Sequence, residues 1–231
     1  MERADARLIH LLRLTSFSDI GVVFDCDGTL VDSEPLSGEA WRRVLAPYGY
    51  ELTEGDLAAC VGRPYAATHA YLAQRVALPD ADAVWPVLSR ELFALIDSSL
   101  EPFEDALEAV EELRARGVPI AVASSSVRER LDRTLARAGL EFEITIAGDE
   151  VEHGKPAPDM FLLAAERLGV ARCVVVEDSP PGVQAGIAAG MPTLAVCRVP
   201  GTEAALAAAT RVVHRITAGA ILELSTAADA A

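Results

Sequence analysis

Short apolar runs alternate with helix-periodic segments along most of the chain. From Pro102 onward, helical and strand signals follow one another with short connections, which is typical of a parallel sheet covered by helices on both faces. An earlier apolar run, Ile20–Phe24, also reads as a buried strand. We therefore expect an α/β fold with a Rossmann-like core of parallel strands. The other predicted strands are 119–123, 144–147, 173–176, 193–196 and a weaker edge strand at 212–213.

Glycine residues mark the predicted helix ends. Helices are predicted over 104–116, 127–138, 158–168 and 182–189. Each is followed by a glycine, the usual left-handed residue just past a helix end. Ser126 and Glu129 have the spacing of a capping box, so we expect a side-chain cap at the start of the second helix. A short helix capped by Thr202 is predicted over 203–209.

The segment 35–100 differs in character from the rest of the chain. It has apolar positions at helical spacing and both tryptophans, Trp41 and Trp85, but no convincing strand. The sequence therefore predicts an inserted α-helical cap domain, 35–100, that is a candidate lid. The rest divides into an N-terminal extension, 1–19, read as a surface helix or frayed tail, and a core domain formed by 20–34 and 101–231.

Composition narrows the classes of partner and the environment. The 231 residues are 51% hydrophobic, enough to bury a sizeable core, and carry a formal net charge of −15. This charge disfavours nucleic acid and anionic membranes as partners. The four widely spaced cysteines indicate neither a disulfide framework nor a zinc site, and no apolar stretch is long enough to span a membrane. We expect a cytoplasmic protein, either a monomer or a weak homodimer.

Polar residues of an unusual kind follow three of the predicted strands. Asp25 and Asp27 come after the first strand, serines 124–126 after the second, and Glu177 with Asp178 after a later one. If these strands are parallel neighbours, their carboxyl ends lie at one edge of the sheet, where such folds bind ligands. The carboxylates would repel one another unless a cation lay between them. The pattern therefore favours a metal-assisted site.

Four ordered motifs carry a resemblance to a known family. The block D-C-D-G-T-L-V-D-S at 25–33 resembles the first motif of the haloacid dehalogenase-like hydrolases, in the branch of small sugar-phosphate phosphatases and β-phosphoglucomutase. That family also has a Ser or Thr ending the next strand, a Lys before a helix, and a later acidic pair. Over about 20–200, this chain matches with Asp25 and Asp27, Ser124, Lys155, and Glu177 and Asp178.

The resemblance implies a role for each acidic residue. Asp25 would attack phosphorus and form an aspartyl-phosphate, while Asp27 would protonate the leaving alcohol and then deprotonate water. Mg²⁺ would be held by the Asp25 carboxylate, the Asp27 backbone carbonyl and Asp178. Glu177 would be a nearby or direct ligand.

The resemblance also implies how the phosphoryl group is held. Ser124, the amide of Ser125, and Lys155 would bind its oxygens. Two arginines are weaker candidates for substrate contacts. Arg63, between Gly62 and Pro64, either touches substrate from the cap or is an exposed residue in a helix-linking turn. Arg128 either reaches the substrate or is a helix-surface charge.

The motifs leave several reactions open. The presence of Asp27 beside Asp25 favours phosphoryl transfer as the reaction, because a dehalogenase needs no second acidic residue next to its nucleophile. A β-phosphoglucomutase-type mutase is the alternative, although the mutase's cap-hinge histidine has no counterpart in 33–37. A non-catalytic metabolite-sensing or partner-binding protein would be expected to have lost a motif residue, and none is lost. We therefore expect a Mg²⁺-dependent phosphatase whose partner is a small phosphorylated substrate, and we expect that substrate to be a sugar phosphate.

Overall fold

The computed structural model describes residues 19–60 and 65–227. Apart from Asp19, the predicted N-terminal extension lies outside the described residues, and so does Arg63. None of the helices within the described ranges combines the length and apolar character that a membrane crossing requires.

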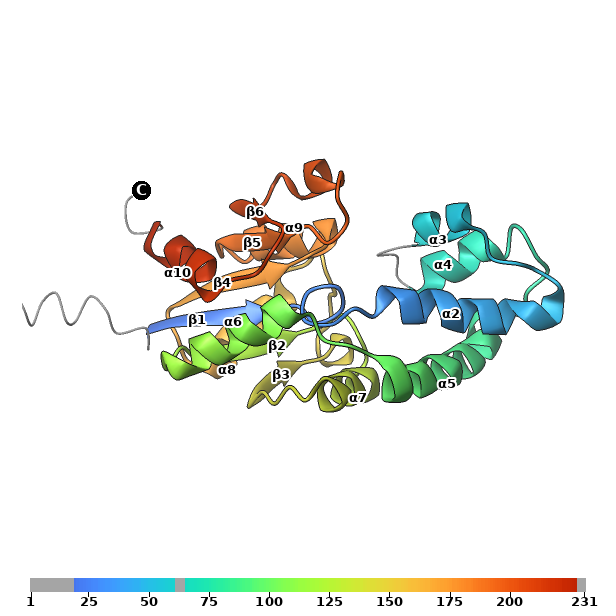
Figure 1. Ribbon diagram of the computed structural model, residues 1–231, viewed down its shortest axis with the longest axis horizontal. Coiled ribbons are helices and arrows are strands. Elements are labelled where there is room, and N and C mark those ends of the chain that lie inside the picture. The colour runs from blue at the N-terminus through green and yellow to red at the C-terminus, as the bar shows by residue number, and fades with distance from the viewer. Residues whose placement is uncertain (1–18, 61–64, 228–231) are drawn as a thin grey trace, which may run out of the picture.

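A six-stranded parallel sheet forms the centre of the fold, with strand order β3-β2-β1-β4-β5-β6 (Figure 1). All six predicted strands are present, and the one at 212–213 lies at the sheet edge as expected. The α/β expectation is confirmed. The strands are β1 (Ile20–Phe24), β2 (Ile120–Ala123), β3 (Ile144–Ile146), β4 (Arg172–Glu177), β5 (Thr193–Val196) and β6 (Arg211–Val213).

Alternating side chains of the strands pack against helices on opposite faces of the sheet. Val22 and Phe24 belong to one hydrophobic cluster, whereas Val23 belongs to another. The first cluster includes side chains of α6 and α10, and the second includes side chains of α8 and α9. These helices are α6 (Glu104–Ala115), α7 (Arg128–Ala138), α8 (Asp159–Leu168), α9 (Pro180–Ala188) and α10 (Ala218–Ala227).

The helix ends agree with the sequence pattern better than the helix starts. Glycines 117, 139, 169 and 190 all have positive φ, as expected of left-handed caps. The predicted capping box is wrong, because Val127 precedes α7 without a side-chain cap and the Ser126 hydroxyl is used elsewhere. The predicted cap at Thr202 is also wrong. Its hydroxyl donates to the Val199 carbonyl at 2.8 Å, and only a 3₁₀ turn, η4 (Glu203–Leu206), follows.

The chain between β1 and α6 forms a helical group beyond the carboxyl end of the sheet (Figure 1). Its described part contains helices and no strand, in the segment where a helical insertion is expected. One hydrophobic cluster runs from Phe24 in the sheet to Trp41 and Leu88 in these helices. The division into core and cap domains stays a prediction. The helices are α2 (Glu34–Leu45), η2 (Ala46–Tyr48), α3 (Glu54–Cys60), α4 (Tyr65–Leu72) and α5 (Ala81–Ser99).

The chain leaves and re-enters the sheet region through two segments that touch. An antiparallel bridge joins Val31 on the outgoing segment to Pro102 on the returning one. The Asp32 amide also donates to the Glu101 carbonyl at 3.0 Å. Two chain segments thus connect the helical group to the sheet, and they are hydrogen-bonded to each other where they leave the sheet region.

Candidate active site

The three polar strand ends meet at the carboxyl edge of the sheet, as the sequence predicts. β1 lies between β2 and β4, so Asp25 is flanked by the residues that follow those two strands. A cavity of about 830 Å³ opens over this edge and is lined by Asp25, Asp27, Ser124 and Lys155 together with residues of the helical group. Residues far apart in sequence therefore share one ligand-sized space.

Lys155 is buried between two carboxylates at the base of the cavity. Its ammonium donates to Asp25, to Glu177 at 2.8 Å and to the Ala123 carbonyl at 3.2 Å, and its side chain is 5% exposed. Burial acts to lower the pKa of Lys155, but the two carboxylates outweigh it and the pKa rises. Burial raises the pKa of Asp25 well above its ordinary value, although Lys155 opposes this. Lys155 is therefore a permanent local cation in an acidic protein.

The acidic residues form a cluster of oxygen donors. Carboxylate oxygens of Asp25, Glu177 and Asp178 lie within 4.8 Å of one another. Burial, and then the neighbouring carboxylates, raise the pKa of Asp178 well above its ordinary value. One ammonium does not balance three carboxylates, so the ionised cluster needs a further positive charge. An all-oxygen donor set fits a hard divalent cation such as Mg²⁺.

Asp27 is held by donors from three different elements. Ser33 donates to it at 2.6 Å, Ser126 at 2.8 Å and Arg130 at 2.7 Å. Burial acts to raise the pKa of Asp27, but Arg130 and the two hydroxyls outweigh it and lower the pKa. Arg130 also has a buried Nε with no hydrogen-bond partner among the described residues. Asp25 and Asp27, two residues apart, therefore differ in protonation behaviour because their partners differ.

The serine loop forms another wall of the cavity. Ser124 is 1% exposed, and its hydroxyl accepts a hydrogen bond from the Ser126 amide at 3.1 Å. Ser124, Ser125 and Ser126 all line the cavity just before α7 begins. The start of a helix carries partial positive charge from its unpaired amides, which favours an anion. The loop is therefore suited to holding phosphoryl oxygens.

The loop after β1 is fixed from two sides. Gly28 has a φ of +82°, and a Cβ at this position would lie 2.1 Å from Asp178 Oδ2, so a larger side chain would be strained and would displace Asp178. On the other side, Arg198 donates to the carbonyl of Gly28 at 3.3 Å and to that of Thr29 at 2.8 Å. Its guanidinium also makes hydrogen bonds of 3.0 and 2.9 Å to buried Asp105. This network sets the position of the loop that carries Asp25 and Asp27.

The two weaker arginine candidates have different outcomes. Arg63 lies outside the described residues, so its predicted role is untested. Arg128 is not among the residues that line the cavity, and its guanidinium donates to Thr145 Oγ1 at 2.8 Å and to Asp132 at 3.1 Å. The described partners of Arg128 therefore lie on α7 and near β3, outside the cavity, and its predicted contact with substrate stays a prediction. Arg130 lines the cavity instead, although the sequence pattern does not distinguish it from Arg128.

Aromatic side chains line the part of the cavity formed by the helical group. Trp41 stacks on Tyr65 with ring centroids 6.0 Å apart, and Trp85 meets the same tyrosine edge-on at 4.8 Å. All three line the cavity. They pack against one another within the helical group, and they also bound the space open to a ligand.

Comparison with known proteins gives consistent results. A family model described as haloacid dehalogenase-like hydrolase matches residues 21–190. Fructose-1-phosphate phosphatase YqaB of Escherichia coli is 38% identical over 177 residues, covering 74% of this chain and 93% of that protein. Phosphorylated carbohydrates phosphatase of Thermotoga maritima is 36% identical over 176 residues, covering 74% and 81%. A crystal structure from Thermotoga maritima, provisionally assigned as a β-phosphoglucomutase, has a TM-score of 0.74 and 31% identity over 90% of this chain and 98% of that one.

Proposed function

The chain belongs to the haloacid dehalogenase-like hydrolases, and we propose that within this family it is a Mg²⁺-dependent phosphatase of small phosphorylated metabolites. The observation that carries the proposal is the pair Asp25 and Asp27 in one cavity. One carboxylate contacts a buried ammonium, and the other is oriented by three separate donors. Such a pair supplies a nucleophile and an acid–base group, which is what transfer of a phosphoryl group to water requires.

Asp25, Asp178 and Glu177 are the side chains that would hold Mg²⁺, and we assign a further ligand to the backbone carbonyl of Asp27. Their oxygen donors and their excess negative charge fit this ion. When bound, Mg²⁺ neutralises charge on the phosphoryl oxygens and orients the group for attack.

In the first step, Asp25 attacks phosphorus as a carboxylate and the substrate alcohol leaves; because its pKa is raised in the free protein, Asp25 would release its proton to solvent as the cation binds. Ser124, the Ser125 amide and Lys155 bind the phosphoryl oxygens, where positioning and charge supply most of the rate. Asp27 gives a proton to the leaving oxygen. Because its pKa is lowered in the free protein, Asp27 must gain that proton as the substrate binds, and the adjacent phosphoryl anion favours this.

In the second step, water attacks the aspartyl-phosphate and Asp25 is regenerated. Asp27, now a carboxylate, takes a proton from that water while Ser33, Ser126 and Arg130 keep it in place. The helical group closes one side of the cavity and limits access of water during the first step.

We assign a sugar phosphate as the substrate class. The two relatives quoted above are named as phosphatases of fructose 1-phosphate and of phosphorylated carbohydrates. The cavity of about 830 Å³ has room for a phosphorylated sugar, and its walls combine the charged sheet edge with aromatic rings. Aromatic faces commonly bind the apolar faces of small ring-shaped ligands, while polar groups fix their orientation.

The test is release of inorganic phosphate from a panel of sugar phosphates and other small phosphoesters in the presence of Mg²⁺. Asp25→Asn keeps the size of the side chain and removes its nucleophilic oxygen, so we expect it to abolish release. Asp132→Asn is the matched control, because Asp132 is exposed on α7 and pairs only with Arg128 among the described residues. Equal activity of Asp25→Asn and wild type would refute the proposal.

A parallel assay for conversion of glucose 1-phosphate to glucose 6-phosphate separates phosphatase from mutase. Interconversion without net phosphate release would assign the protein to the mutases, despite the missing histidine in 33–37. If both assays are silent for wild-type protein, the non-catalytic binding function takes precedence.

A further inference from the structure

A second group of side chains of the kinds that bind metals lies at one edge of the sheet. This is the edge opposite β3, where β5 pairs with the edge strand β6. Cys197 directly follows β5 and His214 directly follows β6. Val196 pairs with Val213 in the parallel register, and the Cys197 amide donates to the Val213 carbonyl at 2.7 Å. Cys197 and His214 are therefore neighbours in register on adjacent strands, where side chains share one face of the sheet.

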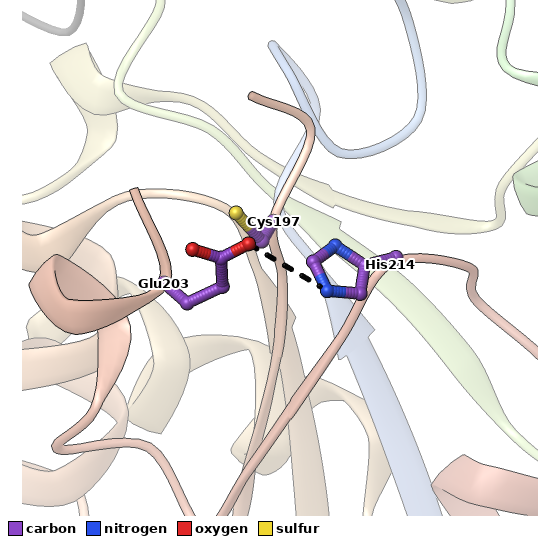
Figure 2. A group of neighbouring side chains, drawn as sticks. All are labelled: Cys197, Glu203 and His214. Carbon is purple, nitrogen blue, oxygen red and sulfur yellow. Dashed lines mark ion pairs between the residues drawn. The ribbon is translucent and has the colours of Figure 1, made fainter. Parts of the chain in front are cut away.

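Glu203 completes the group from the turn between these strands. It is the first residue of η4, and its Oε1 accepts a hydrogen bond from the Gly201 amide at 3.2 Å. The same oxygen is 3.7 Å from His214 Nε2, an ion pair too long for a hydrogen bond (Figure 2). Figure 2 shows the carboxylate, the imidazole and the thiol gathered around one point. Their ligand atoms all lie within 4.8 Å of one another.

We propose that Cys197, Glu203 and His214 bind Zn²⁺ at a site separate from the active site. Thiolate, imidazole and carboxylate are the three side-chain ligands that Zn²⁺ uses in proteins, at about 2.0–2.3 Å from the ion. In the tetrahedral geometry of Zn²⁺ sites, ligand atoms at these distances lie about 3.3–3.8 Å from one another. The 3.7 Å between Glu203 Oε1 and His214 Nε2 is already in this range, and side-chain rotations within the 4.8 Å cluster would bring all three ligand atoms to it.

The surroundings permit these rotations and leave one coordination position open. The side chains of His214 and Glu203 are 65% and 41% exposed, so both can move and water can supply a fourth ligand. Cys197 is buried, and its thiol donates to the Val199 carbonyl at 3.1 Å. On binding Zn²⁺, the thiol releases its proton to solvent and gives up that weak hydrogen bond.

Ligand chemistry separates this site from the acidic cluster of the active site. Asp25, Glu177 and Asp178 offer only oxygen, which suits Mg²⁺, whereas a thiolate is a poor ligand for Mg²⁺ and a good one for Zn²⁺. Bound Zn²⁺ would tie β5, the 198–202 turn and β6 together. Arg198 in this turn holds the loop that carries Asp25, so the site would stabilise a segment on which the active site depends.

The test uses Co²⁺ as a spectroscopic probe on the full-length protein after treatment with a chelator. The titration is run in excess Mg²⁺, which keeps Co²⁺ from the oxygen-only cluster. We expect one equivalent of Co²⁺ to give thiolate-to-metal charge-transfer absorption, and Zn²⁺ to displace it. Cys197→Ser should abolish the band. His214→Gln and Glu203→Gln should each weaken Co²⁺ binding by at least about tenfold, the loss typical of even outer-sphere changes at metal sites.

Cys60→Ser, which changes a partly exposed thiol in α3, is the matched control and should keep the band. Thermal unfolding with and without Zn²⁺ gives a second readout, and the midpoint should rise in wild type and not in Cys197→Ser. The proposal is overturned if wild type shows no charge-transfer band, or if Cys197→Ser keeps it. Because Cys197, Glu203 and His214 do not line the active-site cavity, their variants should release phosphate at the wild-type rate when both are assayed without Zn²⁺, which would show that the variants are folded.

Discussion

Arg198 offers the most direct test of how the active-site loop is held in place. Its guanidinium makes two hydrogen bonds to Asp105, two to the backbone carbonyls of Gly28 and Thr29, and lies over the Phe103 ring at 3.8 Å. The side chains of Arg198 and Asp105 are 17% and 6% exposed, so their charges are largely removed from water. Arg198→Met keeps much of the side-chain length but leaves the Asp105 carboxylate without its cation.

The expected cost follows from this burial. Removing one partner of a buried ion pair typically costs 3–5 kcal/mol, and we take about 3 kcal/mol because Arg198 is partly exposed. In a protein of this size each 1 kcal/mol lowers the unfolding midpoint by roughly 2–4 °C, which predicts a fall of about 6–12 °C. The measurements are urea unfolding and thermal melting. Phosphate release should also fall, because the loop loses its anchor.

The matched control is Arg215→Met. Arg215 pairs with Glu108, and both side chains are more than half exposed, so solvent screens the pair and its loss should change stability little. If Arg198→Met is no less stable than Arg215→Met, the proposed anchoring is refuted.

The same pair predicts a pH dependence of stability. Burial acts to raise the pKa of Asp105, but hydrogen bonds from Arg198 and the Ile216 amide outweigh it, and the folded-state pKa lies below its ordinary value. A lowered folded-state pKa adds stability that is fully present above the unfolded value of about 4 and is lost as the pH falls through the folded value. Arg198→Met should therefore lose stability less steeply than wild type on acidification. Equal slopes would contradict the assignment.

Three further changes probe the active site. Gly28→Ala imposes left-handed backbone strain of roughly 1–2 kcal/mol and places a Cβ against Asp178. Because Asp178 is a proposed Mg²⁺ ligand, the Mg²⁺ concentration for half-maximal activity should rise. An unchanged Mg²⁺ titration would speak against this close contact. Arg130→Gln removes a charge-assisted hydrogen bond to Asp27 worth about 1.5–3 kcal/mol, so kcat should fall by roughly 10–100-fold with little change in KM. Arg130→Lys should recover part of the lost kcat. A change in KM alone would mean that Arg130 binds substrate rather than positioning Asp27. Chelation with EDTA should stop phosphate release, and added Mg²⁺ should restore it; activity that survives chelation would rule out the metal requirement.

Sequence reasoning succeeds where a residue's role depends on its own strand. Asp25, Ser124 and Glu177 each follow a short apolar run, and parallel pairing of those runs is enough to bring their side chains together. Crossover connections favour such parallel neighbours, whereas the full strand order comes from the structure. Lys155 is recognisable only through the family motif, because a lone lysine usually lies on the surface.

The residues that sequence reasoning misses act through tertiary geometry. Ser126 has the spacing of a helix cap, yet the fold turns its hydroxyl toward Asp27 in the loop after β1. Arg128 and Arg130 lie in the same helical turn and have the same charge. Only the direction in which α7 faces the cavity decides that Arg130 contacts Asp27, and a local pattern carries no information about that direction.

The paired segments at the base of the helical group have a consequence for how such a protein can diversify. Because the chain departs at Val31 and returns at Pro102 through neighbouring residues, everything between them joins the sheet region at a single point. Exchanging the 34–100 segment for that of a relative would leave the order and register of all six strands intact. We therefore predict that such a chimera would keep phosphate release and take on the substrate preference of the relative, which the same panel of phosphoesters would measure.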